Sequence, residues 1–286
     1  MASDNRFAVL IDADNVSVKY IKIILDEISK DGIATYKRIY GDWTNPSLIS
    51  WKSTLLDNSI IPVQQYSYTT GKNPTDSAMI IDAMDILYSG RVEGFCLVSS
   101  DSDFTRLAAR LRESGMTVIG MGESKTPNSF IAACNKFKYL DILSAADEAE
   151  AEEAAPKAEP AKKPAAQPKK TAQKAAAKKP KEEPKAEKEP KPAEPKKQQE
   201  KAIEEPRTSL RTIRRALRTI VRENSDEDNW IMVSQVGNLL DKRYTDFDVR
   251  NFGFSKLTPF LESLDMFEIK DMKKDSSSPQ KYVRLK

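Results

Sequence analysis

The sequence of 286 residues contains no histidine. This absence excludes Ser–His–Asp and Cys–His nucleophiles, histidine general bases and zinc sites built on histidine. Cysteine is scarce as well, because Cys96 and Cys134 are the only two and they form no CxxC pair. A disulfide framework or a thiolate metal site is therefore not expected. Any catalysis by this chain would have to be carried out by carboxylates.

Long apolar runs are missing too. No stretch approaches the roughly 20 apolar residues that cross a bilayer, and residues 1–6 contain no signal-like core. We therefore expect a soluble, cytoplasmic protein that makes no membrane contact. The net charge of +3 is too small to indicate or exclude a nucleic-acid partner by itself.

Aromatic residues are absent from residues 147–206, which consist almost entirely of Ala, Glu, Lys, Pro and Gln. Such a composition cannot bury enough apolar surface to offset the entropy of ordering, so we predict a disordered linker. Its lysine-rich parts could also touch nucleic-acid phosphates without specificity. The linker divides the chain into an N-terminal domain, residues 1–146, and a C-terminal domain, residues 207–286.

The N-terminal domain alternates short apolar runs, which predict strands, with apolar spacings of three and four, which predict helices. The predicted strands are 7–11, 35–40, 60–65, 94–99 and 117–121, and the predicted helices are 21–28, 46–56, 75–88, 104–111 and 128–137. This alternation is typical of βαβ units, so we expect an α/β domain with a parallel sheet covered on both faces. Right-handed crossovers would bring the carboxyl ends of its strands to one edge.

Acidic residues come directly after two of these strands. Asp12 and Asp14 follow "FAVLI", and Asp101 and Asp103 follow "FCLVSS". Asp76 begins the helix "PTDSAMIIDAMDIL" on its apolar face, so it is expected to point inward near the same edge. We therefore predict that carboxylates from three distant segments meet at one rim of the sheet.

Structural roles compete with a functional role for these acids. Asp103 could cap the helix that follows it, and Asp76 could favour a helix N-terminus electrostatically. Capping requires only one acid, however, and crowded carboxylates repel one another unless a cation neutralises them. Oxygen ligands without His or Cys favour Mg²⁺ or Mn²⁺, which support phosphodiester hydrolysis without histidine. We therefore predict a site for one of these ions.

The runs "VLIDADNVS", "KNPTDSAMIIDAMDIL" and "FCLVSSDSDFTRLAARLRESGMTVIGMG" together resemble the NYN domain, a branch of the PIN-like nucleases, over most of residues 6–142. The resemblance implies a PIN-like three-layer fold and a metal-dependent, endonucleolytic ribonuclease. By motif position, the catalytic and metal-binding acids would be Asp12, Asp76, Asp101 and Asp103. Asn15 would be the polar companion of the first acid, whereas Asp14 has no assigned place.

Further polar residues near the rim are candidates for substrate contact together with Asn15. Lys72 and Asn73 precede the Asp76 helix and could reach a phosphate, and Ser100 and Ser102 could donate hydrogen bonds around the acidic loop. Nothing among these residues identifies a reader of the 2′-hydroxyl, so DNA stays open beside RNA.

The C-terminal domain begins with "RTSLRTIRRALRTIVREN", which predicts an amphipathic helix with arginines gathered on one face. Like charges at i,i+4 destabilise a helix. Either an anionic partner explains this face, or acids elsewhere in the fold pair with it. The residues taken as candidate RNA contacts are Arg211, Arg214, Arg218 and Lys256.

Two more helices, one from Ser234 and one capped by Ser255, precede two strands in "MFEIKDMKKDSSSPQKYVRLK", which predicts a small winged-helix-like α+β domain. The segment "VGNLLDKRYTDFDVRNFGFSKLTPFLESLDMFEI" is similar to the OST-HTH or LOTUS domain. That resemblance implies RNA binding or, in some members, binding of a helicase.

Two other functions stay open beside the ribonuclease. The chain could be a non-catalytic adaptor that binds RNA and partners. It could also be a phosphatase with an aspartate nucleophile in Asp12–Ala13–Asp14, although that chemistry gives the Asp76 helix no role. The sequence does not indicate an oligomeric state.

Overall fold

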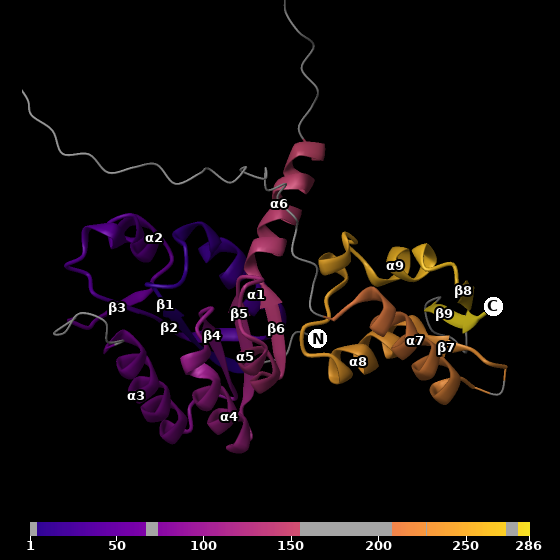
Figure 1. The fold of residues 1–286 in the computed structure, drawn as a ribbon, viewed down its shortest axis with the longest axis horizontal. Coiled ribbons are helices and arrows are strands. Elements are labelled where there is room, and N and C mark those ends of the chain that lie inside the picture. Colours follow the sequence, from indigo (N-terminus) through magenta and orange to yellow (C-terminus); the bar gives the residue numbers. More distant parts are fainter. Residues whose placement is uncertain (1–4, 67–73, 155–207, 227, 273–279) are drawn as a thin grey trace, which may run out of the picture. The chain divides into compact units, whose positions relative to one another are not determined.

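The structure is a computed structural model, and it describes residues 5–66, 74–154, 208–226, 228–272 and 280–286. Two of the predicted substrate contacts, Lys72 and Asn73, lie outside these ranges. The predicted linker lies outside them from residue 155 onward. Figure 1 shows the N-terminal α/β domain in indigo to magenta and the C-terminal α+β domain in orange to yellow.

A six-stranded sheet in which every neighbouring pair is parallel forms the centre of the N-terminal domain. The strands are β1 (Arg6–Asp12), β2 (Ile33–Gly41), β3 (Ile61–Gln64), β4 (Gly94–Val98), β5 (Thr117–Gly122) and β6 (Lys136–Tyr139). Their spatial order is β3-β2-β1-β4-β5-β6, so the direction of winding reverses between β1 and β4. Open α/β sheets bind ligands at such a switch point, outside the carboxyl ends of the strands.

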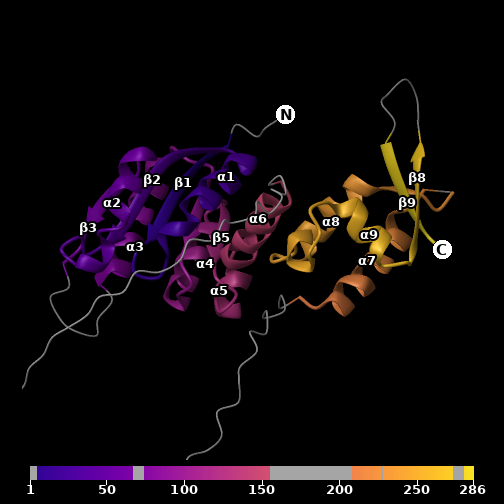
Figure 2. The ribbon, with the colours of Figure 1, turned by 90° about the horizontal axis from the view of Figure 1, so that it is seen from above.

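Helices cover both faces of this sheet, which gives three layers (Figures 1 and 2). One face carries α1 (Ile21–Asp31), α2 (Trp51–Asp57) and α6 (Leu140–Ala154), and the other carries α3 (Pro74–Ser89), α4 (Thr105–Glu113) and α5 (Asn128–Ala133). Alternate residues of β1 enter the two apolar cores, with Val9 in one and Leu10 in the other. Central strands are therefore apolar on both sides. The predicted α/β fold class is confirmed.

The predicted helix over 128–137 is wrong in its second half. Helix α5 ends at Ala133, and the chain then forms the edge strand β6 beside β5. In this strand Phe137 and Tyr139 are buried, with ring centroids 5.3 Å apart, whereas Lys136 and Lys138 alternate with them. This period of two is typical of a strand, and it was masked by the helical spacing of the preceding apolar residues.

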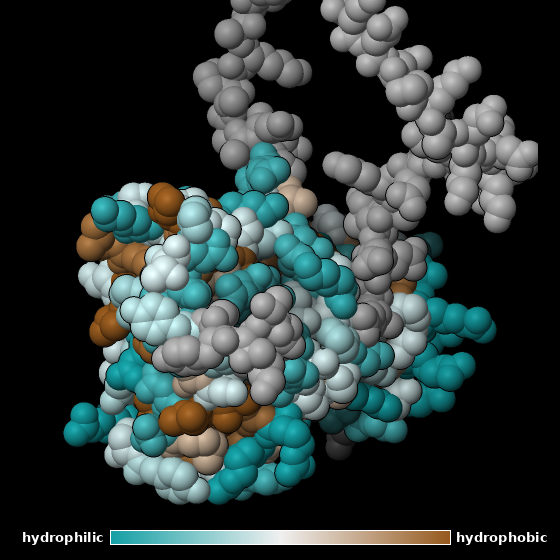
Figure 3. Space-filling view, turned by 60° about the vertical axis from the view of Figure 1, so that its left-hand side comes forward, coloured by the Kyte–Doolittle hydropathy of each residue, from teal (hydrophilic) through white to brown (hydrophobic). Residues whose placement is uncertain are grey.

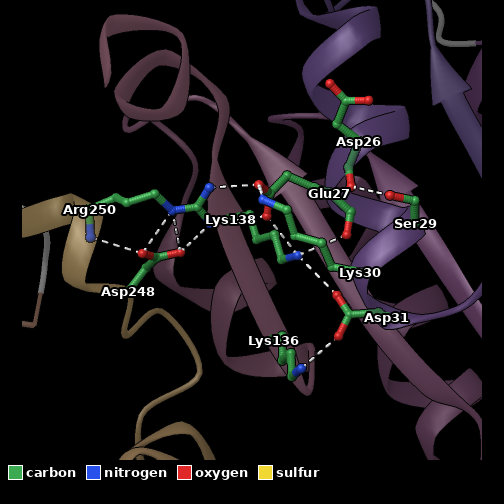
Figure 4. A network of polar contacts seen from close by, with 9 residues as sticks. All are labelled: Asp26, Glu27, Ser29, Lys30, Asp31, Lys136, Lys138, Asp248 and Arg250. Carbon is green, nitrogen blue, oxygen red and sulfur yellow. Dashed lines mark hydrogen bonds and ion pairs between the residues drawn. The ribbon is translucent and has the colours of Figure 1, made fainter. Parts of the chain in front are cut away.

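The lysines of β6 are held by acids of α1, as Figure 4 shows. Lys138 Nζ lies 2.9 Å from a carboxylate oxygen of Glu27 and 2.9 Å from one of Asp31, and Lys136 Nζ lies 2.7 Å from the other oxygen of Asp31. Burial alone would raise the pKa of Asp31, but the two lysines outweigh it and hold that pKa below its usual value. The edge of the sheet is thus tied to α1 by ion pairs.

Some apolar side chains reach the surface of the N-terminal domain. Ile49, Leu56 and Ile61 are more than half exposed, and the last of these lies on the edge strand β3. On the face shown in Figure 3, brown apolar side chains lie in separate places among teal and white ones. Scattered exposed apolar residues are normal in folded proteins, so we assign them no function.

The described residues of the C-terminal domain form three α-helices and a small antiparallel sheet. The helices are α7 (Leu210–Asn224), α8 (Val233–Arg243) and α9 (Leu257–Ser263), with the short η4 (Val249–Phe252) between the last two. The strands are β7 (Ile231–Met232), β8 (Phe267–Met272) and β9 (Gln280–Leu285), in the order β7-β9-β8. The predicted helices and hairpin are present, and β7 is an addition. The predicted Ser255 cap is wrong, because Lys256 occupies the N-cap position of α9.

Helix α6 runs through Ala154, so the predicted domain boundary at residue 146 falls inside a helix. Its Ala- and Glu-rich composition has high helix propensity, which a reading based on low hydrophobicity does not capture. Among the described residues, no helix has the length and apolar character that crossing a membrane requires.

Candidate metal centre

The ends of β1 and β4 lie side by side at the switch point of the sheet. The two strands pair in parallel, with Ile11 opposite Val98, so the residues that follow them are neighbours. Ser99 Oγ donates a hydrogen bond to Asp12 Oδ2 over 2.8 Å, and it accepts one from the backbone N–H of Asp101 over 3.1 Å. The two acidic loops are thus joined through a buried serine hydroxyl.

Three carboxylates come together beside this junction. One oxygen from each of Asp76, Asp101 and Asp103 lies within 4.8 Å of the other two. Asp76 is buried at the start of α3, Asp101 is half-buried, and Asp103 is exposed. Carboxylates this close repel one another unless a cation compensates. With oxygen donors and no histidine in the sequence, the group fits a hard divalent cation such as Mg²⁺ or Mn²⁺.

Asp101 also organises the turn that carries this group. It is the N-cap of the short η3 (Ser102–Phe104), and its Oδ1 accepts a hydrogen bond from the backbone N–H of Asp103 over 3.0 Å. The capping residue is therefore Asp101 and not Asp103. A carboxylate has about four lone-pair sites, so capping leaves acceptor capacity for a cation.

Asp12 differs from the other predicted ligands, because it is not part of the group of three among the described residues. Its side chain is fully buried, and its oxygens accept hydrogen bonds from Ser99, from Asn15 Nδ2 over 2.8 Å and from the backbone N–H of Asp14 over 3.0 Å. Burial raises the pKa of Asp12, and these donors lower it only in part. Asp12 therefore connects the two loops through buried hydrogen bonds.

Asp14, which the sequence motif left unassigned, connects the first loop to α3. Thr75 Oγ1 donates a hydrogen bond to Asp14 Oδ2 over 2.9 Å. Because Thr75 immediately precedes Asp76, this bond holds the start of α3 against the end of β1. The sequence carried no signal for this pairing, since the two residues are far apart in the chain.

Of the remaining predicted substrate contacts in the NYN domain, one serves the fold and two are exposed to solvent. Ser100 Oγ accepts a hydrogen bond from the backbone N–H of Glu123 over 2.9 Å, so it fastens the loop after β5. Ser102 and Asn15 are exposed beside the acids. The structure adds Gly122 to the site, a residue that the sequence motifs did not indicate. A Cβ at this position would lie 2.6 Å from the carbonyl oxygen of Ser99. Only glycine permits β5 to approach the site this closely.

Two family models match the chain. One, described as the NYN domain, matches residues 6–141 and so includes all of the clustered acids. The other, described as the OST-HTH/LOTUS domain, matches residues 207–278. The chain carries an NYN domain followed by an OST-HTH/LOTUS domain. These matches confirm the predicted resemblances and their order. NYN domains are nuclease-like, and OST-HTH domains bind RNA.

Two solved structures that match parts of the chain have low structural similarity to it. A protein of unknown function from Vibrio parahaemolyticus RIMD 2210633 shares 19% identity over 48% of this chain and 94% of its own, with a TM-score of 0.40. An uncharacterized protein from Nitrosomonas europaea shares 26% identity over 32% of this chain and 89% of its own, with a TM-score of 0.25. No curated protein was found to match the chain.

The predicted RNA contacts of the OST-HTH domain fall in two places. Arg211, Arg214 and Arg218 are exposed on α7 and line one hollow. Lys256 is exposed at the start of α9 and does not belong to that hollow. The structure thus groups the three arginines and separates the lysine from them.

Proposed function

We propose that this protein is a divalent-metal-dependent ribonuclease that cleaves RNA endonucleolytically at the acidic cluster of its NYN domain. The observation that carries the proposal is the convergence of Asp76, Asp101 and Asp103 within 4.8 Å at the switch point of the sheet. These residues come from α3 and from the loop after β4, so only the folded domain brings them together.

The three carboxylates would hold Mg²⁺ or Mn²⁺ through oxygen atoms alone. When bound, such an ion supplies positive charge to the phosphodiester and favours deprotonation of an attacking water. Asp103 and Ser102 are exposed, so this part of the rim is open to a polymer from solvent. Asp101 orients the turn through its cap, which keeps Asp103 in place beside it.

Burial of Asp12 argues against the phosphatase alternative. An aspartate nucleophile has to reach the phosphorus atom, whereas the Asp12 side chain is fully buried and its oxygens are engaged by Asn15, Ser99 and the Asp14 backbone. Its surroundings suit a residue that positions the loops, and Asp12 as a direct ligand stays a prediction.

A cleavage assay with defined substrates tests the proposal. We expect the full chain to open a closed circular RNA with Mn²⁺ or Mg²⁺, and to lose this activity in EDTA. A circle has no ends, so an exonuclease would leave it intact. Circular single-stranded DNA and a small phosphomonoester are the comparison substrates. Metal binding without cleavage of any RNA would favour the adaptor, and hydrolysis of the phosphomonoester alone would favour a phosphatase.

Ser99→Ala should lower the rate of RNA cleavage about tenfold, as losses of supporting hydrogen bonds at metal sites do. The Ser99 hydroxyl lowers the pKa of Asp12, so its removal should raise that pKa further. Asp12 would then ionise at higher pH, and the acidic limb of the pH–rate profile should move upward. Ser114→Ala, at the residue that follows α4 and outside the acidic loops, is the control. An unshifted profile would contradict the role of Ser99.

A further inference from the structure

Helix α7 of the OST-HTH domain carries a stripe of arginines that the metal centre does not explain. The stripe consists of Arg211, Arg214, Arg215, Arg218 and Arg222, all of them exposed. Their spacing places them along one side of the helix, over about 16 Å at a rise of ~1.5 Å per residue. The opposite side, with Ile213 and Leu217, is buried in the domain core.

The arginines of this stripe have no acidic partner within the part of the chain that the structure describes. The ion pairs within the OST-HTH domain use other basic residues, namely Arg250, Lys281, Arg284 and Lys286. One sequence-based explanation of the stripe was pairing with acids elsewhere in the fold, and the described residues contain no such pairing. The five positive charges form no ion pair among the described residues and outnumber the two acids, Glu223 and Asp265, that line the same hollow, so this surface favours an anionic ligand.

The stripe lies between two hollows of the domain surface. One has a volume of about 730 Å³, and besides the arginines its lining includes Met266 and two exposed acids, Glu223 and Asp265, the second of which pairs with Lys286. The other, of about 450 Å³, adds Arg243 and Tyr244. Both include Arg211 and Arg215, so the two hollows adjoin along the helix. Together with the stripe they form what we call the arginine groove.

We propose that the arginine groove binds single-stranded RNA, with its phosphates on the stripe and unpaired bases in the two hollows. The guanidinium group is planar and can donate two parallel hydrogen bonds to a phosphate. The partly exposed Met266 side chain on one side and the Tyr244 ring on the other provide surfaces for bases. A duplex keeps its bases stacked inside and could not use these surfaces.

This inference rests on the proposed function, because it names the surface that delivers substrate to the acidic cluster. It also departs from the sequence-based reading in two respects. It adds Arg215 and Arg222 to the predicted contacts, and it leaves out Lys256, which lies outside the groove.

The test measures binding of the full chain to a fluorescein-labelled single-stranded RNA 20-mer by anisotropy, in EDTA, at several KCl concentrations. The variant is R214A/R218A, and the matched control is K242A/K256A, which removes the same charge from exposed positions outside the groove. We expect R214A/R218A to raise the Kd at least about tenfold, since hydrogen bonds to charged groups are strong. The slope of log K against log salt should fall by about 1.4, at ~0.7 for each lost phosphate contact. The control should stay near wild type.

Three results with the variants would overturn the proposal, and a fourth concerns duplex RNA. The first is a wild-type Kd and salt slope in R214A/R218A, and the second is an equal loss in K242A/K256A. Binding of poly-glutamate is measured alongside RNA binding. The third result is that R214A/R218A loses poly-glutamate binding but keeps RNA binding, which would assign the groove to an acidic protein partner. Duplex RNA serves as the comparison ligand, and tighter binding of duplex than of single strand would contradict the assignment of bases to the hollows.

The experiment is independent of the cleavage assay because EDTA suppresses metal-dependent turnover. A chain that binds RNA through the groove yet never cleaves it would support this inference and overturn the proposed ribonuclease. Circular dichroism establishes that R214A/R218A is folded, and alanine is favourable in an exposed helix, so loss of structure is not expected.

Discussion

Asp101→Asn should reduce Mn²⁺-dependent RNA cleavage by about 100-fold or more. Asparagine lacks the negative charge that attracts the cation, and the charge stabilisation that a bound cation supplies is worth several kcal/mol. The fold should survive. Asparagine is as good an N-cap as aspartate, so its side-chain oxygen can keep accepting from the Asp103 N–H. Removing one of three crowded carboxylates should leave the metal-free melting temperature unchanged or higher. Initial rates and thermal melts with and without Mn²⁺ measure both effects.

Asp85→Asn is the matched control for this variant, since Asp85 is exposed on α3 and lies outside the acidic cluster. It should cleave at the wild-type rate. Mn²⁺ should raise the melting temperature of wild type and of Asp85→Asn but not of Asp101→Asn, because a ligand that binds the folded state stabilises it. Cleavage by Asp101→Asn at the wild-type rate would mean that the active site lies elsewhere.

Phe260→Ala should destabilise the OST-HTH domain by about 3–5 kcal/mol, the usual cost of removing a buried aromatic ring. The Phe260 side chain is fully buried, and its ring centroid lies 5.3 Å from that of Phe252 and 5.5 Å from that of Phe254. A domain of this size has only a small core, so this loss is most of its stability. Hydrogen exchange resolved by peptide should show fast exchange in α7 and β9, with the NYN sheet still protected.

Phe254→Ala provides the comparison, because Phe254 belongs to the same aromatic cluster but is partly exposed. It should cost less stability and leave RNA binding measurable. Phe260→Ala should abolish RNA binding by the arginine groove, since α7 is placed by packing on this core. Protection in α7 equal to that of wild type would contradict the importance of the cluster.

The acidic rim of the NYN domain was predictable because its signal is local. An apolar run followed at once by acids marks the carboxyl end of a strand, and this pattern located the loop that contains Asp101 and Asp103. Which acids are close enough to share an ion depends on strand order and on how α3 packs. Asp12 is buried and accepts a hydrogen bond from Ser99, and it does not belong to the group of three among the described residues, so its role as a ligand stays a prediction.

Strand β6 shows the opposite case, in which two local signals competed. Phe130, Cys134 and Phe137 recur at helical spacing, and this pattern extended the predicted helix too far. The alternation from Lys136 to Tyr139 was also present, but over only four residues. The strand conformation of these residues is stabilised by pairing with the edge of β5 and by the α1 acid that binds the two lysines.

The sequence by itself determined the α/β class, the two domains in their order, and an all-oxygen acidic site in a chain without histidine. These properties follow from composition and from periodicities of two and 3.6, which act over a few residues. The sequence also predicted that Asp76 meets Asp101 and Asp103, but only the tertiary structure decided that their oxygens lie within 4.8 Å of one another, that Asp12 is buried, and that the α7 arginines have no acidic partner among the described residues. Burial and pairing join segments that are distant in the chain, so no local pattern can specify them.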